Sequence, residues 1–496
     1  FYLIKLVIEQ KSDFLKYKQL SLGRALFPIL ILVILLSYNV MVYGDNALSG
    51  SNQFILLLGA AVAAVVGFQM KISYHSMIDK VAENLQSVTG ALLILLFVGA
   101  LAGTWLISGI IPAMIYYGLQ ILHPSIFLPA CILICAIISL ATGSSWTTSA
   151  TVGIALIGIG KVLGIPVGMV AGAVISGAYF GDKLSPLSDT TNLAPAMAGG
   201  ELFNHIRYMT ITTIPSILIT LVVFFIISLT QTTSGTADIA ALMMAIKDKF
   251  TIHLGLFFVP LVVVLLIIRK TPPLIALLIG TLLGGLFALI FQQNILMEVA
   301  QVETFSFSSA YKGIMDSITI STQITTSNPI LNDLFSSGGM EGMLGTIWLI
   351  ICAMVFGGVM DAIGALARIS NALLEWAQTT FQLFASTVAS CLAINLTASD
   401  QYLSIVIPGK MFAEAYKKRG LAPENLSRTL EDSGTVTSVL IPWNTCGAYQ
   451  SGVLGVGVGE YFIYAIFNWL SPLMTLCFAF FKIKIKEKVN KVTASH

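Results

Sequence analysis

Residues 181–192 are Gly181-Asp182-Lys183-Leu184-Ser185-Pro186-Leu187-Ser188-Asp189-Thr190-Thr191-Asn192. This polar stretch follows an apolar run over 165–180, which is expected to lie inside a lipid bilayer. Carboxylates and an ammonium group are costly at that depth and persist only where they line a cavity or pair with other groups. Because Pro186 lacks an amide hydrogen, we expect the helix to break here and to expose backbone carbonyls. The stretch therefore predicts an ion site within the membrane.

The composition is that of a membrane protein. The 496 residues are 56% hydrophobic and only 10% charged, whereas soluble domains carry about 25% charged residues. The chain holds many runs close to the roughly 20 apolar residues that a spanning helix needs. We therefore predict an all-α polytopic membrane protein in contact with lipid. The net charge of +2 gives no indication of nucleic-acid binding, and the six cysteines lie in apolar runs where they suit packing.

The apolar runs form two sets of similar order. Thr142-Gly143-Ser144 resembles Thr397-Ala398-Ser399, Asp182 has a counterpart in Asp432, and Asn192 has one in Asn444. We interpret this as an internal duplication with two inverted repeats of about five transmembrane helices, each with a re-entrant hairpin and a discontinuous helix. The expected parts are an N-terminal cytoplasmic segment (1–23), a first repeat (24–230, hairpin about 125–160, broken helix about 165–198), a linker (231–251), a second repeat (252–482, hairpin about 378–415, broken helix about 424–447) and a basic cytoplasmic tail (483–496).

Basic residues support this threading. With the N-terminus inside, all but five of the 26 lysines and arginines fall on the cytoplasmic side, as the positive-inside rule requires. The five are Lys161, Lys247, Lys249 and Lys312 outside, and Lys183 in the broken helix. The charge pattern does not distinguish re-entrant hairpins from pairs of full spans. We favour hairpins because their tips carry the remaining polar clusters, which a hairpin would bring beside the helix breaks.

The polar clusters offer oxygen ligands for a small hard cation such as Na⁺. A carboxylate in a poorly hydrated cavity is disfavoured in its charged form, so one aspartate can hold either a proton or Na⁺, which is sufficient for antiport. The candidate coupling residues are Asp182, Asp189, Asp400 and Asp432, and the candidate ion or substrate ligands are Thr142, Ser144, Ser145, Ser185, Ser188, Asn192, Thr397, Ser399, Ser433, Thr435, Thr437, Asn444 and Thr445. Within this set, Asp182, Ser144, Asn192, Thr397 and Asp432 are the predicted Na⁺ ligands.

Each candidate also has a structural explanation. An aspartate after a proline, such as Asp189, can simply cap a helix. Hydroxyl groups in apolar helices often bond to their own backbone, so about half of those named are expected to be structural. An enzyme is disfavoured, because Gly143-Ser144-Ser145 has no histidine within an apolar run to activate a serine. We expect no cofactor besides the transported ion.

The stretch from Gly181 to Ala194 closely resembles the NhaC-type Na⁺/H⁺ antiporter family. Thr142–Trp146, Thr397–Gln401, Glu431–Thr435 and Pro442–Thr445 fit the same pattern. The resemblance implies Na⁺/H⁺ exchange by an elevator-like motion in the bacterial inner membrane, often in a homodimer with both termini in the cytoplasm. The family also contains a malate/lactate exchanger branch and other members thought to move amino acids. A Na⁺- or H⁺-coupled carrier of a small organic anion or amino acid is therefore the alternative, since substrate does not transfer with fold.

Overall fold

The computed structural model describes residues 20–43, 50–121, 123–230 and 239–487, which fold almost entirely into helices. Eight helices in these ranges are long and apolar enough to cross a membrane, or nine if Ala240–Lys249 and Leu254–Ile268, bent by 80°, form one span. The eight are α2 (Leu22–Tyr43), α3 (Ser51–Gln69), α4 (Tyr74–Ile107), α6 (Pro124–Thr142), α11 (Leu202–Thr230), α14 (Pro273–Phe291), α18 (Leu344–Ala362) with the turn η4 (Glu341–Met343) before it, and α20 (Thr380–Thr397). The expectation of a polytopic helical membrane protein is confirmed.

Shorter helices complete the fold. In the first part of the chain they are α5 (Ile110–Ile121), α7 (Ser145–Thr148), the π-helical turn η2 (Ser149–Gly153), α8 (Ile154–Val162), α9 (Val167–Leu184) and α10 (Asp189–Ala198). Then follow α12 (Ile239–Lys249), η3 (Leu254–Phe257), α13 (Phe258–Ile268), α15 (Gln293–Ala300), α16 (Phe307–Thr319) and α17 (Pro329–Leu334). The last are α19 (Ala365–Trp376), α21 (Gln401–Lys418), α22 (Pro423–Leu430), the π-helical turn η5 (Glu431–Thr435), η6 (Ser438–Leu440), α23 (Thr445–Leu454), α24 (Val458–Tyr461) and α25 (Ile466–Phe480).

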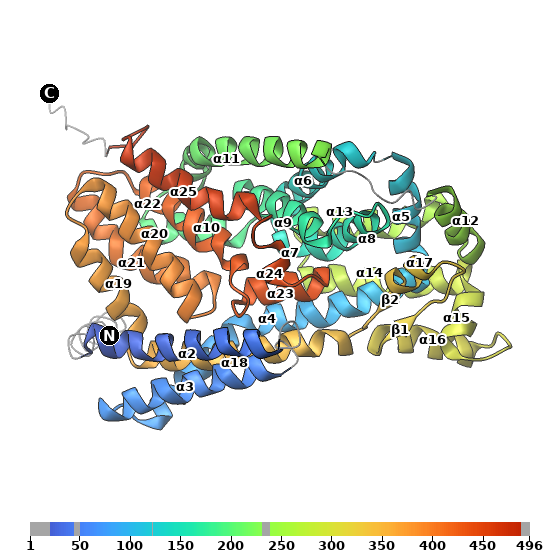
Figure 1. The fold of residues 1–496 in the computed structure, drawn as a ribbon, viewed down its shortest axis with the longest axis horizontal. Coiled ribbons are helices and arrows are strands. Elements are labelled where there is room, and N and C mark those ends of the chain that lie inside the picture. Colours follow the sequence, from blue (N-terminus) through green and yellow to red (C-terminus); the bar gives the residue numbers. More distant parts are fainter. Residues whose placement is uncertain (1–19, 44–49, 122, 231–238, 488–496) are drawn as a thin grey trace.

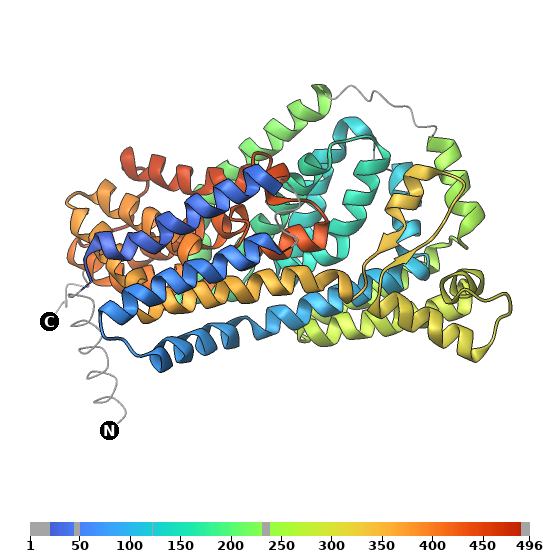
Figure 2. The ribbon, with the colours of Figure 1, turned by 60° about the horizontal axis from the view of Figure 1, so that its bottom comes forward.

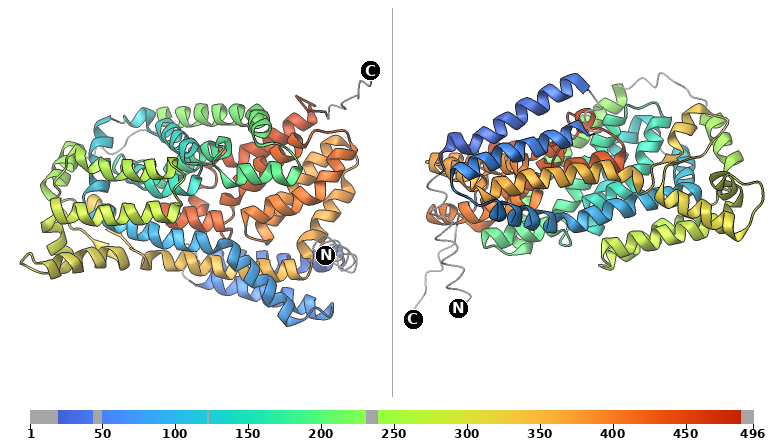
Figure 3. Two further views of the ribbon diagram at one scale, coloured as in Figure 1. Left: turned by 180° about the vertical axis from the view of Figure 1, so that it is seen from behind. Right: turned by 90° about the horizontal axis from the view of Figure 1, so that it is seen from below.

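Helices α2–α4, α13, α14 and α18 pack side by side, and we call them the scaffold. Figure 1 shows α2, α3, α4 and α18 along the lower edge and α11 along the upper edge, and α18 packs against both α3 and α4. Figure 2 shows this layer running along the long axis, and the views from behind and below in Figure 3 agree. The interrupted helices α9–α10 and α22–α23 lie between these two edges (Figure 1).

Close backbone approach joins the first hairpin helix to the first broken helix. A Cβ atom on Gly177 would lie 2.2 Å from the backbone oxygen of Ile132, and one on Gly181 would lie 2.3 Å from that of Ala136. Lipid provides no hydrophobic driving force between helices, so small residues that allow tight van der Waals packing are favoured there. The glycines of α9 thus let α6 and α9 pack along much of their length.

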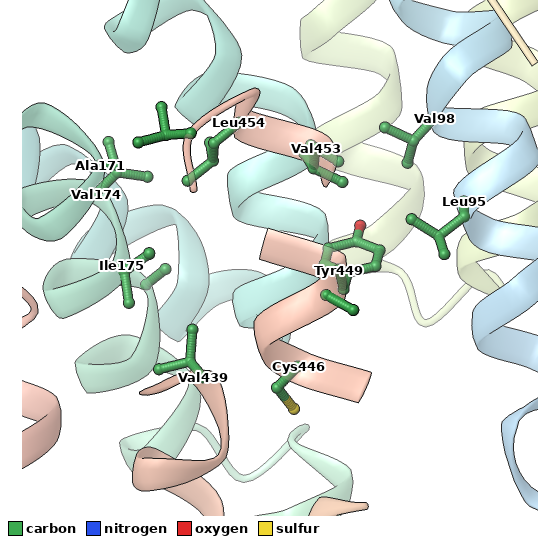
Figure 4. Packing of buried hydrophobic residues seen from close by; sticks show 14 of the residues in the cluster. Leu95, Val98, Ala171, Val174, Ile175, Val439, Cys446, Tyr449, Val453 and Leu454 are labelled. Atoms are coloured by element: carbon green, nitrogen blue, oxygen red, sulfur yellow. The ribbon is translucent and has the colours of Figure 1, made fainter. Parts of the chain in front are cut away.

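Helix α23 lies between α4 and α9 in the hydrophobic core (Figure 4). Figure 4 shows Val453 and Tyr449 of α23 on the side of Leu95 and Val98 of α4, with Leu454 toward α9. These side chains belong to one continuous cluster of buried hydrophobic residues. The ring of Tyr449 stacks on Trp146, with ring centroids 4.0 Å apart, and its hydroxyl donates to the Trp146 carbonyl. The second interrupted helix is therefore packed directly against the start of α7.

Three details differ from the expectations. The predicted linker contains a helix, α12, at 239–249, while 231–238 fall outside the described residues, as do 1–19 and 488–496. The segment between α14 and α18 adds α15, α16, α17 and a two-stranded ribbon of β1 (Thr322–Gln323) and β2 (Ser336–Ser337). Arg428 is completely buried inside the protein, which the charge pattern did not predict. Short amphipathic helices and a buried charge give no strong hydropathy signal, which is why the pattern missed them.

Candidate functional site

The turn between α6 and α7 (142–145), which we call the first tip, contacts the segment between α9 and α10 (185–188), which we call the first helix break. Helix α6 ends at Gly143, which adopts a left-handed conformation with φ of 71°. A Cβ atom there would lie 2.6 Å from the Leu187 Cβ and 2.9 Å from the Ser188 nitrogen. Ser145 then donates two hydrogen bonds to the Asp182 carboxylate, from its backbone nitrogen at 3.1 Å and its hydroxyl at 2.7 Å. The tip thus holds the carboxylate at the end of α9.

The second tip, the turn between α20 and α21 (397–401), likewise contacts the second helix break, which precedes α23 (441–444). Ser399 has a positive φ of 60°, and its carbonyl accepts a hydrogen bond from the Thr445 nitrogen at 2.9 Å. The Trp443 indole donates to the Leu396 carbonyl at 2.9 Å, and Asn444 donates to the Asn395 carbonyl at 3.1 Å. Both tips therefore lie beside the helix breaks, where the polar clusters were expected to meet.

One cavity of about 720 Å³ lies where these segments converge. Its wall comes from both tips, both breaks, the scaffold helix α4 and the loop between α13 and α14. The polar residues in its lining are Ser87, Thr142, Ser144, Asp182, Ser188, Asp189, Thr190, Asn192, Lys270, Thr271, Asp400, Gln401, Tyr402 and Thr445. Segments from both halves of the chain therefore build one site.

The cavity is rich in negative charge. Asp182 is 9% exposed, Asp400 is 1% exposed, and Asp189 is exposed at its surface. Within the described part of the chain, Lys270 is the one basic side chain in the lining. Helices starting at Ser145, Asp189, Gln401 and Thr445 direct their N-terminal ends toward the same space, and this partial positive charge stabilises the nearby carboxylates. Three carboxylates against one ammonium group favour a cation in the cavity.

Two lining residues have side-chain oxygens with spare capacity for a ligand. Thr142 has a buried hydroxyl that makes no hydrogen bond to the described residues. Asn192 donates both of its amide bonds to carbonyls, those of Pro186 at 3.0 Å and Ser188 at 2.7 Å. Neither bond uses its oxygen, which remains an acceptor in a residue that lines the cavity. Together with the Asp182 carboxylate, these are oxygen ligands of the kind that a hard cation takes.

Asp432, the counterpart of Asp182, lies elsewhere. Its carboxylate accepts hydrogen bonds from the Lys183 ammonium group, from Ser471 at 3.1 Å, from Thr212 at 2.8 Å and from Thr475. Lys183 and Asp432 are both completely buried, and Asp432 is absent from the cavity lining. A buried lysine needs a counter-ion, and the ammonium group takes the position that a bound cation would have at Asp432.

The predicted ligands divide between the cavity and the protein interior. The cavity lining includes Thr142, Ser144, Ser188, Asn192 and Thr445, while Ser145 reaches it through Asp182. Thr397, Ser433 and Thr437 donate to carbonyls one turn earlier in their own helices. Ser185, Ser399, Thr435 and Asn444 are buried and outside the lining. This division agrees with the expectation that many hydroxyls are structural.

Sequence reasoning missed several lining residues. Thr190 lies within the quoted stretch and could have been included on the same grounds as its neighbours. Tyr402 follows the second tip by two residues. Ser87 and Lys270 are contributed by the scaffold, and nothing in the local pattern of a scaffold helix or loop indicates that it faces a site built by distant segments.

Comparison with known proteins identifies the family. Residues 177–483 match the model of the Na⁺/H⁺ antiporter family. The chain is 38% identical over 433 residues to the Na(+)/H(+) antiporter NhaC of Alkalihalophilus pseudofirmus, covering 87% of this chain and 91% of that protein. It is 36% identical to the malate-2H(+)/Na(+)-lactate antiporter of Bacillus subtilis (84% and 86% covered) and 33% identical to the arginine/ornithine antiporter ArcD of Halobacterium salinarum (95% and 94% covered). The chain is therefore an integral membrane protein that belongs to the Na⁺/H⁺ antiporter family.

Proposed function

We propose that this protein exchanges Na⁺ for H⁺ across the bacterial inner membrane, with Asp182 as the central carboxylate. The observation that carries the proposal is the cavity between the tips and the breaks, which three carboxylates line. Asp182 is nearly buried and fixed by Ser145, so it has few water molecules to stabilise its charge. Na⁺ can neutralise it, and Na⁺ binding then competes with protonation of the site.

The cavity residues have distinct roles in this proposal. Asp182, Thr142 and Asn192 supply oxygen ligands in the cavity wall, and Ser144 contributes from the first tip. Asp400 adds a second carboxylate from the other half, where it also caps α21 through the Leu403 nitrogen at 2.9 Å. Asp189, at the exposed side, attracts cations toward the cavity. We leave Asp432 and Thr397 out of the Na⁺ site because neither lines the cavity.

Alternating access forms the second part of the proposal. We infer two inverted repeats, in which the hairpins 125–160 and 378–415 and the broken helices move together against the scaffold of α2–α4, α13, α14 and α18. The cavity borders the loop that carries Arg269 and Lys270, and the positive-inside rule assigns this loop to the cytoplasm. In this proposal the described conformation is therefore inward-facing.

A homodimer with both termini in the cytoplasm completes the proposal.

Transport in proteoliposomes tests the proposed activity. An imposed Na⁺ gradient should drive a pH change inside vesicles that contain the protein and none in empty vesicles. Asp182→Asn should reduce exchange to the background of empty vesicles, because an amide can neither bind a proton nor neutralise Na⁺. Asp248→Asn, the same substitution at an exposed position of α12, is the matched control and should exchange normally. Full exchange by Asp182→Asn would remove Asp182 from the mechanism.

A Na⁺- or H⁺-coupled carrier of a small organic acid or amino acid is the second candidate. The cavity volume of about 720 Å³ favours it, because this space is large for a bare ion. The helix N-termini around the cavity would suit a carboxylate bound together with Na⁺. The same vesicles decide between the two: a pH change that requires malate, lactate or an amino acid would replace simple Na⁺/H⁺ exchange.

A further inference from the structure

Glu431 is a buried carboxylate behind the cavity for which the proposed function has no role. It begins the π-helical turn η5 and has no exposed surface. Neither carboxylate oxygen makes a hydrogen bond of good geometry to the residues that the structure describes. The hydroxyl groups of Thr190 and Thr435 are among the groups that interact with it. An unpaired buried carboxylate is unfavourable, and π-helical turns are often found at functional sites.

A short series of hydroxyl groups connects Glu431 to the cavity. Thr190, whose hydroxyl faces Glu431, lies in the cavity lining. Its oxygen is 3.2 Å from that of Ser188, and the Ser188 hydroxyl in turn faces the Asp182 carboxylate. Hydroxyl groups both donate and accept hydrogen bonds, so this series is the route by which we infer that a proton moves between the cavity and Glu431.

Charge balance gives Glu431 a specific task. Lys183 and Arg428 are both fully buried, and both lie beside Asp432, with Arg428 Nε 4.0 Å from its carboxylate. Arginine is always charged, so two cations face one aspartate. Glu431 interacts electrostatically with Lys183 and with Asp182. An ionised Glu431 makes this buried cluster neutral, whereas a protonated Glu431 leaves one excess positive charge.

The neighbouring elements add little further charge. Against η5 pack α10, α20, α21, α22 and α25, as well as the end of α9 through Lys183 and α11 through Thr212. In the described part of the chain, the charged or titratable groups near the cluster are Asp182, Lys183, His205, Tyr208, Cys391, Tyr416, Glu424 (paired with Lys486), Arg428 and Asp432. Thr212, Ser404, Ser471 and Thr475 contribute hydroxyl groups.

We propose that Glu431 is the proton-binding residue of the exchange cycle, and that Na⁺ at Asp182 expels this proton by charge balance rather than by direct replacement. The inference deepens the proposed function and rests on it. With Na⁺ bound, Asp182 is neutralised and an ionised Glu431 neutralises the cluster. Without Na⁺, the Asp182 charge is balanced by the excess positive charge that remains when Glu431 is protonated. Both states are neutral overall, and one proton leaves through Thr190 and Ser188 to water for each Na⁺ that enters.

The number of protons released per bound Na⁺ tests this inference. Purified protein in detergent and weak buffer is titrated with Na⁺, with binding measured by radioactive ²²Na⁺ and proton release by a pH dye. Wild-type protein should release about one proton per Na⁺, the value required by the charge balance above. Glu431→Gln should release almost none. Glu424→Gln, a buried glutamate of α22 that pairs with Lys486, is the matched control and should release as many as wild type.

A second variant distinguishes a charge effect from a folding defect. Glu431→Gln leaves the cluster with one excess positive charge, so its Na⁺ affinity should fall at least tenfold. Arg428 lies over the Tyr208 ring and makes no hydrogen bond to the described residues, so Arg428→Gln removes that excess charge without breaking a hydrogen bond. The Arg428→Gln/Glu431→Gln variant should recover Na⁺ binding, still without proton release.

Three outcomes of these measurements would contradict the inference or the proposed function. One proton per Na⁺ from Glu431→Gln would overturn this inference and leave the proposed function intact, with Asp182 carrying the proton itself. Absence of Na⁺ binding in the double variant would overturn it as well, because Glu431 would then act as a Na⁺ ligand or a structural residue. Wild-type protein that binds Na⁺ without releasing a proton would overturn the proposed function.

Discussion

At the residue scale, equivalent positions in the two halves have acquired different tasks. Asp182 faces the cavity and is held by Ser145, whereas Asp432 is bound by Lys183 in the interior. The sequence placed both aspartates in broken helices and both were reasonable ion ligands. Sequence patterns do not predict that Lys183 pairs with Asp432, which lies 249 positions later, because pairing across the halves depends on tertiary packing.

The Lys183–Asp432 pair should be important for stability. Lys183→Met removes the ammonium group that donates to Asp432 and leaves this buried carboxylate with hydroxyl partners and the Arg428 guanidinium at 4.0 Å. The expected loss is about 3–5 kcal/mol of unfolding free energy, as for other broken buried pairs. Lys80→Met, which removes an exposed pair with Glu83, should cost at most about 1 kcal/mol. Thermal unfolding in detergent compares the two, and equal losses would contradict the role assigned to the buried pair.

At the scale of elements, the site depends on the contact between hairpin tips and helix breaks. Proline and glycine mark these places clearly, so the interruption near Pro186 and the turn at Gly143 were predictable from the sequence. The helices α15–α17 and the ribbon between α14 and α18 were not, because short segments bury too little apolar surface to give a periodic signal. Ser87 and Lys270 line the site through the packing of elements that are distant in the sequence.

Gly143 provides a test of the tip-to-break contact. Gly143→Ala forces alanine into a left-handed conformation, at a cost of about 1–2 kcal/mol, and also places a methyl group against Leu187. Gly199→Ala introduces the same backbone strain, with φ of 76° but open space around the Cβ. We expect Gly143→Ala to weaken Na⁺ binding and slow exchange, and Gly199→Ala to leave both nearly unchanged. Similar behaviour of the two variants would show that the contact does not shape the site.

At the scale of the whole molecule, one cavity is shared by a scaffold and two interrupted helices. The eight apolar helices and the family membership confirm the membrane protein that hydropathy predicted. The inverted repeats and the elevator motion stay predictions, because the alignment of polar clusters cannot fix the direction in which each helix crosses the bilayer.

Sided labelling tests the orientation. In a cysteine-free background, Ala91→Cys on the scaffold side of the cavity should react with an impermeant maleimide from the cytoplasmic side if the proposed orientation, in which the cavity opens to the cytoplasm, is correct. Lys312→Cys in α16 should react from the opposite side. Labelling of Ala91→Cys only from the outside would reverse the assigned orientation.

The central claim is that Na⁺ and a proton compete through the carboxylates in and directly behind this cavity. Its most direct test is Na⁺ titration of the purified protein at several pH values, with Asp182→Asn beside wild type. We expect the apparent Na⁺ affinity of wild type to fall about tenfold for each unit of decreasing pH in the range where the proton is bound, the slope for one displaced proton. Asp182→Asn should bind no Na⁺. A wild-type affinity that does not change with pH would contradict the account.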